Sequence, residues 1–231
     1  MNKQLIAVIV IILGVIGTVF WLKNKPKDEL YTVMKVPEFS MTNQNNQTIT
    51  NRDMLGKVYV VEFFFTSCPT ICPVMSHNLR SIEDEINDAN LGFISVTIDP
   101  KRDTPARLLE YAKQIGVKSP NWHYLTSNRE NIEQLSDKFN IYVGKDETTA
   151  EGLNHSGKLA LVDKQGNIRS RYDKMGVPML FYSGLNYKDP EGKEPSLGGK
   201  YHPEIEFLKE DIKKLLACLL YTSDAADEED S

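Results

Sequence analysis

The segment KVYVVEFFF, from Lys57 to Phe65, is the feature that most constrains the fold. It is β-branched or aromatic at nearly every position and lacks the polar alternation of a half-exposed strand, which is typical of a strand buried on both faces. A strand of that kind needs a layer of helices on each side of its sheet. The sequence therefore predicts an α/β domain with this strand inside a mixed central sheet flanked by helices.

Strands and helices alternate along the rest of the domain. We expect strands at 38–41, 47–50, 91–98, 121–125, 158–163 and 168–172, and helices at 72–89, 104–115, 128–139 and 204–217. The tripeptide Asp103-Thr104-Pro105 is a typical helix start, with a capping residue followed by proline. The stretch from Lys174 to Pro203 is rich in glycine, proline and tyrosine, and we expect it to be a long surface loop inserted in the domain.

An apolar run of 18 residues without a charge, Leu5 to Leu22, stands near the start of the chain. At about 1.5 Å per residue a helix of this length spans about 27 Å, close to the hydrocarbon thickness of a bilayer. Trp21 suits the membrane interface, and no small-residue cleavage site follows. We therefore expect residues 1–22 to be an uncleaved membrane anchor, 23–35 a polar tether and 36–217 the soluble domain. The lysines on the two sides of the run leave its orientation open.

The net charge of −5 comes entirely from the last 14 residues, 218–231, which carry five acids and no base. The rest of the chain has 27 acidic against 27 basic residues, and its lack of a basic excess argues against a general nucleic-acid binder. The stretch CLLYTSDAADEEDS also back-translates to a transposon-type sequencing-library adapter. We expect 218–231 to be an adapter-derived artefact and leave Cys218 out of the chemistry.

Cys68 and Cys72 stand in FTSCPTICP, between the buried strand and the next helix. Their spacing would place both on one side of the first helical turn, with Cα atoms about 6 Å apart. That separation suits a disulfide, and equally suits two thiolates that bind one soft metal ion such as Cu(I). Because a helix N-terminus favours the anion, we expect lowered thiol pKa values.

Histidine is the usual third ligand for such a pair, and His155 precedes a core strand in a loop that could reach the end of the helix. We expect His77 to lie at the surface and His123 to have a structural role, and His202 falls in the expected loop. Asp99 ends the second buried strand at the same sheet edge as the cysteines. It could tune the site or simply cap its loop.

Three segments carry a family resemblance: FFFTSCPTICPVM (63–75), SVTIDPKRDTPARLLEYAKQIG (95–116) and NHSGKLALVDKQGNIRSRYD (154–173). On these segments the chain resembles the Sco/SenC family of membrane-tethered, thioredoxin-like copper proteins. The resemblance implies copper ligands at Cys68, Cys72 and His155, for Cu(I) and also Cu(II). It implies a domain on the outer side of the cytoplasmic membrane, delivering copper or reducing equivalents to the dinuclear copper site of cytochrome c oxidase. The insertion after Asp173 departs from the family pattern.

The cysteine pair is compatible with four functions. The leading one is a copper metallochaperone, and the second is a thiol–disulfide oxidoreductase that reduces a partner's cysteines. A thiol peroxidase would need an activating arginine or tryptophan near the thiolate, which TSCPTICP lacks. A purely structural disulfide would close a loop of three intervening residues and constrain the unfolded chain little.

Overall fold

The computed structural model describes residues 14, 30–141, 143–145, 153–173, 175–185 and 204–217; for 143–145 and 153–155 it describes the backbone alone. Apart from residue 14, the expected anchor lies outside these residues, as do most of the expected tether, His202 and the stretch 218–231. Within them, no helix is long and apolar enough to cross a membrane.

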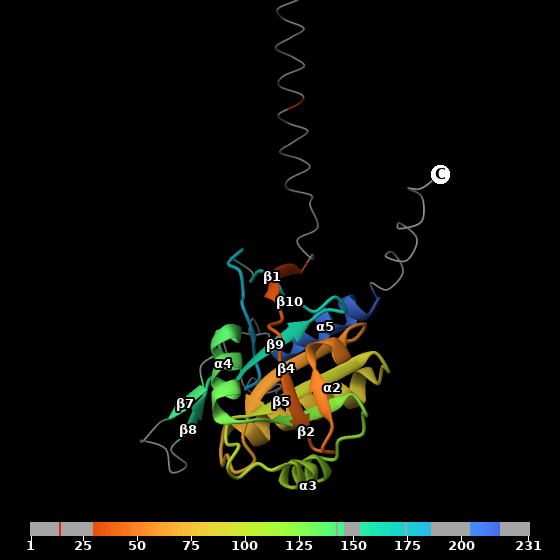
Figure 1. Ribbon diagram of the computed structural model, residues 1–231. Coiled ribbons are helices and arrows are strands. Elements are labelled where there is room, and N and C mark those ends of the chain that lie inside the picture. Colours follow the sequence, from red (N-terminus) through yellow and green to blue (C-terminus); the bar gives the residue numbers. More distant parts are fainter. Residues whose placement is uncertain are drawn as a thin grey trace, which may run out of the picture.

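A nine-stranded mixed sheet forms the centre of the described part, in the order β1-β10-β9-β4-β5-β6-β2-β3, with β11 also paired to β9 (Figure 1). Its strands are β1 (Tyr31–Lys35), β2 (Ser40–Asn43), β3 (Thr48–Thr50), β4 (Val58–Phe64), β5 (Leu91–Thr97), β6 (Trp122–Thr126), β9 (Lys158–Val162), β10 (Asn167–Ser170) and β11 (Tyr182–Ser183). The strands β4, β5 and β6 are parallel, and the remaining pairs are antiparallel. All side chains of β4 and β5 are buried, as the sequence predicted for the centre of the sheet.

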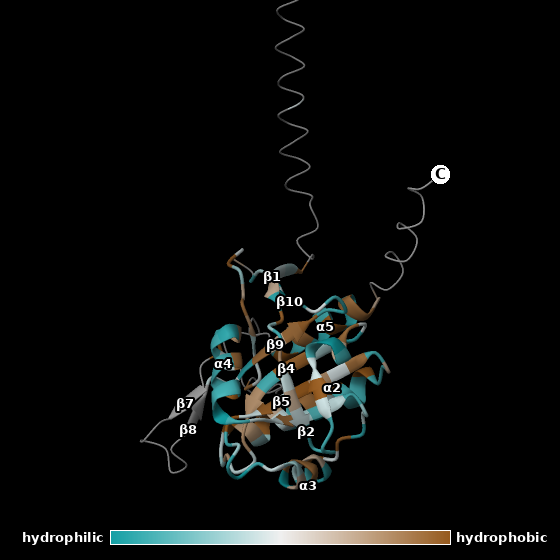
Figure 2. Cartoon of the chain, viewed as in Figure 1, coloured by the Kyte–Doolittle hydropathy of each residue, from teal (hydrophilic) through white to brown (hydrophobic). Residues whose placement is uncertain are grey.

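Helices cover both faces of this sheet: α2 (Ile71–Ile86), α3 (Pro105–Ile115), α4 (Arg129–Phe139) and α5 (Glu204–Ala217). Phe64 of β4 packs on Tyr111 of α3, whereas its neighbour Phe63 packs on Phe139 of α4. Because adjacent strand residues point to opposite faces, α3 and α4 lie on opposite sides of the sheet. The residues that α3 and α4 bury are mostly apolar, among them Leu108 and Tyr111 of α3 and Ile132 and Phe139 of α4. Figure 2 shows both polar and apolar residues along α4.

Local signals explain where the helices begin. Thr104 caps α3 by accepting a hydrogen bond from the backbone N–H of Arg107, with Pro105 at the first helical position. Asn128 caps α4 in the same way, through the N–H of Asn131. A short 3₁₀ helix, η1 (Asn51–Met54), precedes β4, and a two-stranded sheet pairs β7 (Val143–Lys145) with β8 (Leu153–His155).

Two expectations about boundaries were wrong. The tether does not extend to residue 35, because Tyr31–Lys35 forms β1 and pairs with β10. The stretch from Lys174 is not simply a surface loop, because β11 lies within it, pairs with β9 and buries Tyr182 completely. Only residues 175–185 of that stretch are described, and they add to the sheet and to the core.

Candidate functional site

The cysteine loop connects the end of β4 to the start of α2 and carries both thiols. Cys68 lies in the loop, where its backbone N–H donates to Phe65 O at 3.2 Å, and Cys72 lies in the first turn of α2. The helix begins only at Ile71, so the two residues do not share a helical face as their spacing suggested. The thiols nevertheless meet, because a hydrogen bond joins Cys68 and Cys72.

Both cysteines are buried: Cys68 is 8% exposed and Cys72 is 1% exposed. The hydrogen bond with Cys68 and burial raise the pKa of Cys72 far above the ordinary value of a thiol. The expectation of a lowered pKa was therefore wrong for Cys72. The hydrogen bond with Cys68 and, after it, desolvation of the thiolate outweigh the partial charge of the helix N-terminus.

Asp103 holds the cysteine loop in place from the next connection of the sheet. Its fully buried carboxylate accepts hydrogen bonds from the backbone N–H and the hydroxyl of Thr66, two residues before Cys68. Thr97, at the end of β5, donates a third hydrogen bond to the same carboxylate. A charged acceptor with three donors fixes the loop more firmly than neutral contacts would.

Asp99, the acid singled out from the sequence, lies in a different environment from that of Asp103. Its carboxylate accepts a hydrogen bond from the largely exposed Arg102 at 3.1 Å, and its backbone oxygen accepts from the N–H groups of Arg102 and Asp103. These contacts close the turn after β5. Among the described hydrogen bonds, Asp103 rather than Asp99 reaches the cysteine loop, and the capping motif at residues 103–105 was the only sequence signal that marked it.

Glu62 is a second residue that the sequence reasoning missed. It lies fully buried in β4, where Ser95 donates to its Oε1 at 2.7 Å and Trp122 Nε1 in turn donates to Ser95 at 3.0 Å. Its Oε2 lacks a hydrogen-bond partner among the described groups, as does the hydroxyl of Tyr124. Burial raises the pKa of Glu62 to about 7, and its charge interacts with Cys72. The lone carboxylate within KVYVVEFFF was the available signal.

The backbone brings His155 to the same edge of the sheet as the cysteines. His155 ends β8, and β9 begins three residues later and runs antiparallel to β4, with Leu159 opposite Glu62. The start of β9 therefore lies beside the end of β4, from which the cysteine loop departs. The side chain of His155 is outside the described residues, and among described side chains no three His, Cys, Asp or Glu residues gather into a metal-binding group.

The segment after β11 packs against both the His155 loop and α2. Gly184 donates its N–H to Gly157 O at 2.9 Å, and its own oxygen accepts from Asn78 of α2 at 2.8 Å. A Cβ at Gly184 would lie 3.0 Å from Met75 Cγ, so a larger residue here would have to displace side chains of α2 and β9 by a few tenths of an ångström. The first part of the insertion thus ties the segment after His155 to the helix that carries Cys72.

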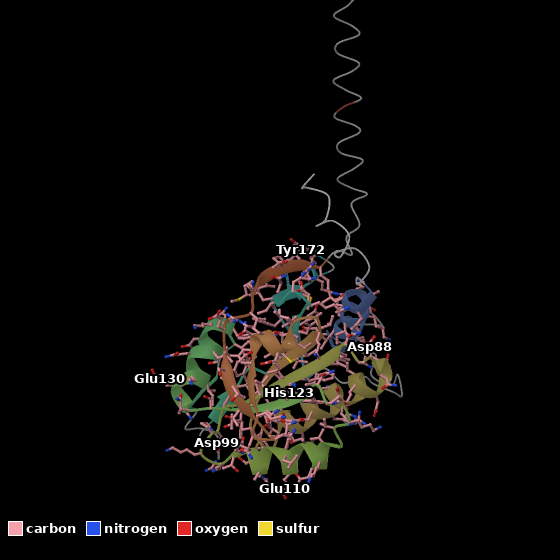
Figure 3. The ribbon with its side chains drawn as sticks, turned by 45° about the vertical axis from the view of Figure 1, so that its right-hand side comes forward. Asp88, Asp99, Glu110, His123, Glu130 and Tyr172 are labelled. Carbon is pink, nitrogen blue, oxygen red and sulfur yellow. The ribbon has the colours of Figure 1, made fainter. Side chains whose placement is uncertain are left out.

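The other described histidines have the roles that the sequence indicated. His77 is exposed on α2. His123, on β6, is partly buried, with its Nδ1 3.5 Å from Asn43 Nδ2, and burial lowers its pKa. Figure 3 shows His123 and Asp99 at separate places on the molecule.

Comparison with known proteins gives one consistent result. Residues 28–182 match the model of the SCO1/SenC family. An SCO2-like protein of Rickettsia typhi is 32% identical over 181 residues, which cover 71% of this chain and 88% of the relative. The crystal structure of a SCO1/SenC family lipoprotein from Bacillus anthracis is similar at 25% identity with a TM-score of 0.64, covering 82% of this chain and 98% of the lipoprotein. Arabidopsis thaliana ScoI with copper bound shares the fold, at 23% identity and a TM-score of 0.58 over 78% of this chain and 97% of ScoI.

Proposed function

The chain belongs to the SCO1/SenC family, and from that premise we propose that it is a copper metallochaperone with Cys68, Cys72 and His155 as ligands. The observation that carries the proposal is the pair of buried thiols, joined by a hydrogen bond at the start of α2. Two sulfur donors at contact distance match the preference of Cu(I) for soft ligands. The Arabidopsis relative with copper bound supports the same cargo.

Binding requires both thiols to give up their protons, because thiolates rather than thiols bind the metal. The position of Asp103 keeps the cysteine loop in one conformation while this happens, so that little ordering accompanies copper capture. Burial of Cys68 and Cys72 limits access of water and oxidants to the sulfur atoms. His155 would complete the site from the end of β8. The contact between Gly157 and Gly184 holds the connection that follows His155 near α2.

Transfer to an acceptor would proceed by ligand exchange. An acceptor thiolate binds the copper, one chain thiolate leaves and takes up a proton, and the exchange repeats until copper rests on the acceptor. No electron moves in this sequence. The acceptor that the family suggests is the dinuclear copper site in the copper-bearing subunit of cytochrome c oxidase, with the soluble domain held on the outer face of the membrane by Leu5–Leu22.

A thiol–disulfide oxidoreductase is the second candidate, favoured by the side-chain hydrogen bond that places Cys68 beside Cys72. In that reaction Cys68 and Cys72 give two electrons and two protons to a partner disulfide, and two partner thiols form. Delivery of copper to a cysteine site requires the acceptor to be reduced, so the two activities are compatible.

The test is an anaerobic Cu(I) titration of the full chain in detergent micelles against a competing chelator. The variants are Cys68→Ser/Cys72→Ser and His155→Ala, with His77→Ala as the exposed-histidine control. We expect one tightly bound copper per chain, lost in the double variant, weakened in His155→Ala and unchanged in His77→Ala. Tight binding that is indifferent to His155 would favour the oxidoreductase, and no binding by the reduced protein would end the copper proposal.

A further inference from the structure

The loop from Tyr172 to Leu180, between β10 and β11, exposes apolar side chains to solvent. It carries four of the five large apolar side chains that are exposed among the described residues: Tyr172 (49%), Met175 (86%), Val177 (53%) and Leu180 (47%). Scattered apolar side chains are ordinary on a protein surface, but a cluster within one loop marks a surface that contacts something apolar.

Hydrogen bonds fix the backbone of the described residues in this loop, 172–173 and 175–180, which we call the 172–180 loop. The N–H of Asp173 donates to Val177 O, and Asp173 Oδ1 accepts from the N–H groups of Met175 and Val177, all at 2.8 Å. Tyr172 and Pro178 form an isolated β-bridge, and Gly176 supplies the positive φ of +83° that the turn needs. The apolar side chains are therefore held outward by an ordered turn, while the carboxylate of Asp173 is occupied by backbone donors.

The loop packs directly against the first strand of the domain. The rings of Tyr31 and Tyr172 lie 4.9 Å apart, and the hydroxyl of Tyr31 donates to Met179 O. Tyr31 is the first residue of β1, so the apolar surface lies beside the point at which the chain enters the fold. Figure 1 shows β1 and β10 together at this end of the molecule.

The length of chain before β1 limits how far this end can be from a membrane. Eight residues, 23–30, separate the apolar run Leu5–Leu22 from Tyr31, and at 3.3–3.6 Å per residue they reach at most about 30 Å. A domain of this length is about 40 Å across. If the run is anchored in a bilayer, the surface beside Tyr31 therefore faces the lipid more closely than the opposite end does. Lys23, Lys25 and Lys27 in the same stretch complement anionic headgroups.

We propose that the 172–180 loop inserts into the interfacial region of the membrane that holds the anchor and fixes the orientation of the domain on it. The proposal rests on the anchor included in the proposed function. Tyrosine suits the headgroup level, while Met175, Val177 and Leu180 reach the adjoining acyl chains. Figure 3 shows Tyr172 at the opposite end of the molecule from Glu110 of α3 and away from Asp99, so the edge with the Asp99 turn faces away from the lipid.

The experiment is lipid quenching of a tryptophan placed in the loop of the full chain. Met175→Trp and the control Glu110→Trp are each made in a Trp21→Phe background and reconstituted into vesicles of phosphatidylcholine and phosphatidylglycerol, with or without bromine on the acyl chains. The remaining tryptophan, Trp122, is buried in the core. Its fluorescence is the same in both proteins and is subtracted as background. We expect the tryptophan at position 175 to be quenched severalfold more than the tryptophan at position 110.

Each other outcome overturns the proposal in a distinguishable way. Equal quenching at the two positions, in chains that float with the vesicles, rejects insertion of the loop and leaves the anchor intact. A blue-shifted emission at position 175 that depends on protein concentration and not on bromine assigns the surface to a second copy of the chain. Failure of the chains to float with the vesicles rejects the membrane anchor as well as the insertion of the loop. The copper titration in micelles tests the metal site separately, whichever of these outcomes is found.

Discussion

Asp103 accepts hydrogen bonds from both the backbone N–H and the hydroxyl of Thr66, and so fixes the cysteine loop from a residue 37 positions later in the chain. The N–H of Thr66 lies 3.1 Å from Asp103 Oδ2. Because Thr97 donates to the same carboxylate, one buried acid joins the end of β4, the end of β5 and the start of α3. The position of Cys68 therefore depends on a residue that touches neither thiol in any described contact.

Asp103→Asn should weaken Cu(I) binding by about tenfold, the lower end of the loss found when an outer partner of a metal site is removed, because Asp103 positions the Cys68 loop through Thr66 and does not bond a ligand itself. The amide keeps the shape of the side chain, but one of its two oxygen acceptors becomes an N–H donor, and Thr66 loses part of its support. The measurement is the same chelator competition used for the cysteine variants, together with the free energy of unfolding in urea.

Asp99→Asn is the matched control for Asp103→Asn. Its carboxylate pairs with an Arg102 side chain that is 62% exposed, and such pairs contribute little. We expect near-normal copper affinity in this variant. An equal loss of affinity in the two variants would contradict the assignment of the positioning role to Asp103.

Burial of Glu62 predicts that the protein loses stability as the pH rises through the weakly acidic range. The pKa of Glu62 is raised from 4.5 to about 7 in the folded protein, so the folded state holds a proton that the unfolded state has lost. This contribution is fully present below pH 4.5 and is lost as the pH approaches 7, a difference of about 3 kcal/mol in the free energy of unfolding.

Urea denaturation followed by the fluorescence of Trp122 checks this prediction, because Trp122 is two hydrogen bonds away from Glu62. Measured from pH 4.5 to 7.5, the free energy of unfolding should fall more steeply with pH in the wild type than in Glu62→Gln. His123 titrates in both proteins and cancels in the comparison. Parallel curves would show that Glu62 stays ionised when the chain folds.

Much of the fold could be predicted from the sequence because its central elements are determined locally. The strands β4 and β5 are largely apolar and buried throughout, and Thr104 and Asn128 are caps that begin helices within one residue of the expected positions. The closeness of the two cysteines could be predicted for the same reason, since only three residues separate Cys68 in the connection from Cys72 in the first turn of α2.

The parts that could not be predicted depend on contacts between distant residues. Tyr31–Lys35 is a partly exposed strand next to a lysine-rich stretch, and only its pairing with β10 distinguishes it from a tether. Tyr182 and Ser183 are a strand only because β9 is beside them. The raised pKa of Cys72 likewise arises from burial and from Cys68, whereas position on the helix alone predicted a lowered one.

Asn78→Ala should release the segment after β11 from α2. The side chain of Asn78 is buried and donates to Gly184 O at 2.8 Å, so its loss leaves a carbonyl without that donor and costs about 1–3 kcal/mol. We expect faster hydrogen exchange at the N–H of Gly184, which bonds Gly157 O. Asn131→Ala, which removes an exposed hydrogen bond to Ser127, is the control and should leave that exchange unchanged. Unchanged exchange in Asn78→Ala would mean that the segment is held by other contacts.

Removal of Arg171 should destabilise the protein, because it leaves the carboxylate of Asp211 on α5 buried without its main ionic partner. Arg171 Nε and Nη2 each lie 2.6 Å from one Asp211 oxygen, Tyr182 donates to the same carboxylate at 2.8 Å, and Asp211 is fully buried. Arg171→Leu leaves the Asp211 charge in the core with weaker partners, and we expect a loss of about 3–5 kcal/mol in the free energy of unfolding.

The double variant Arg171→Leu/Asp211→Asn separates pairing from packing. Once the aspartate is neutral, the arginine is no longer needed to compensate it, so the double variant should be less destabilised than the sum of the two single variants. Arg171→Lys should fall between wild type and Arg171→Leu, because lysine keeps the charge but cannot form the two-pronged contact. Urea denaturation of the four proteins gives the coupling energy directly. A coupling near zero would show that the cost arises from lost packing of Arg171 on the Phe207 ring, 4.4 Å away, rather than from the charge on Asp211.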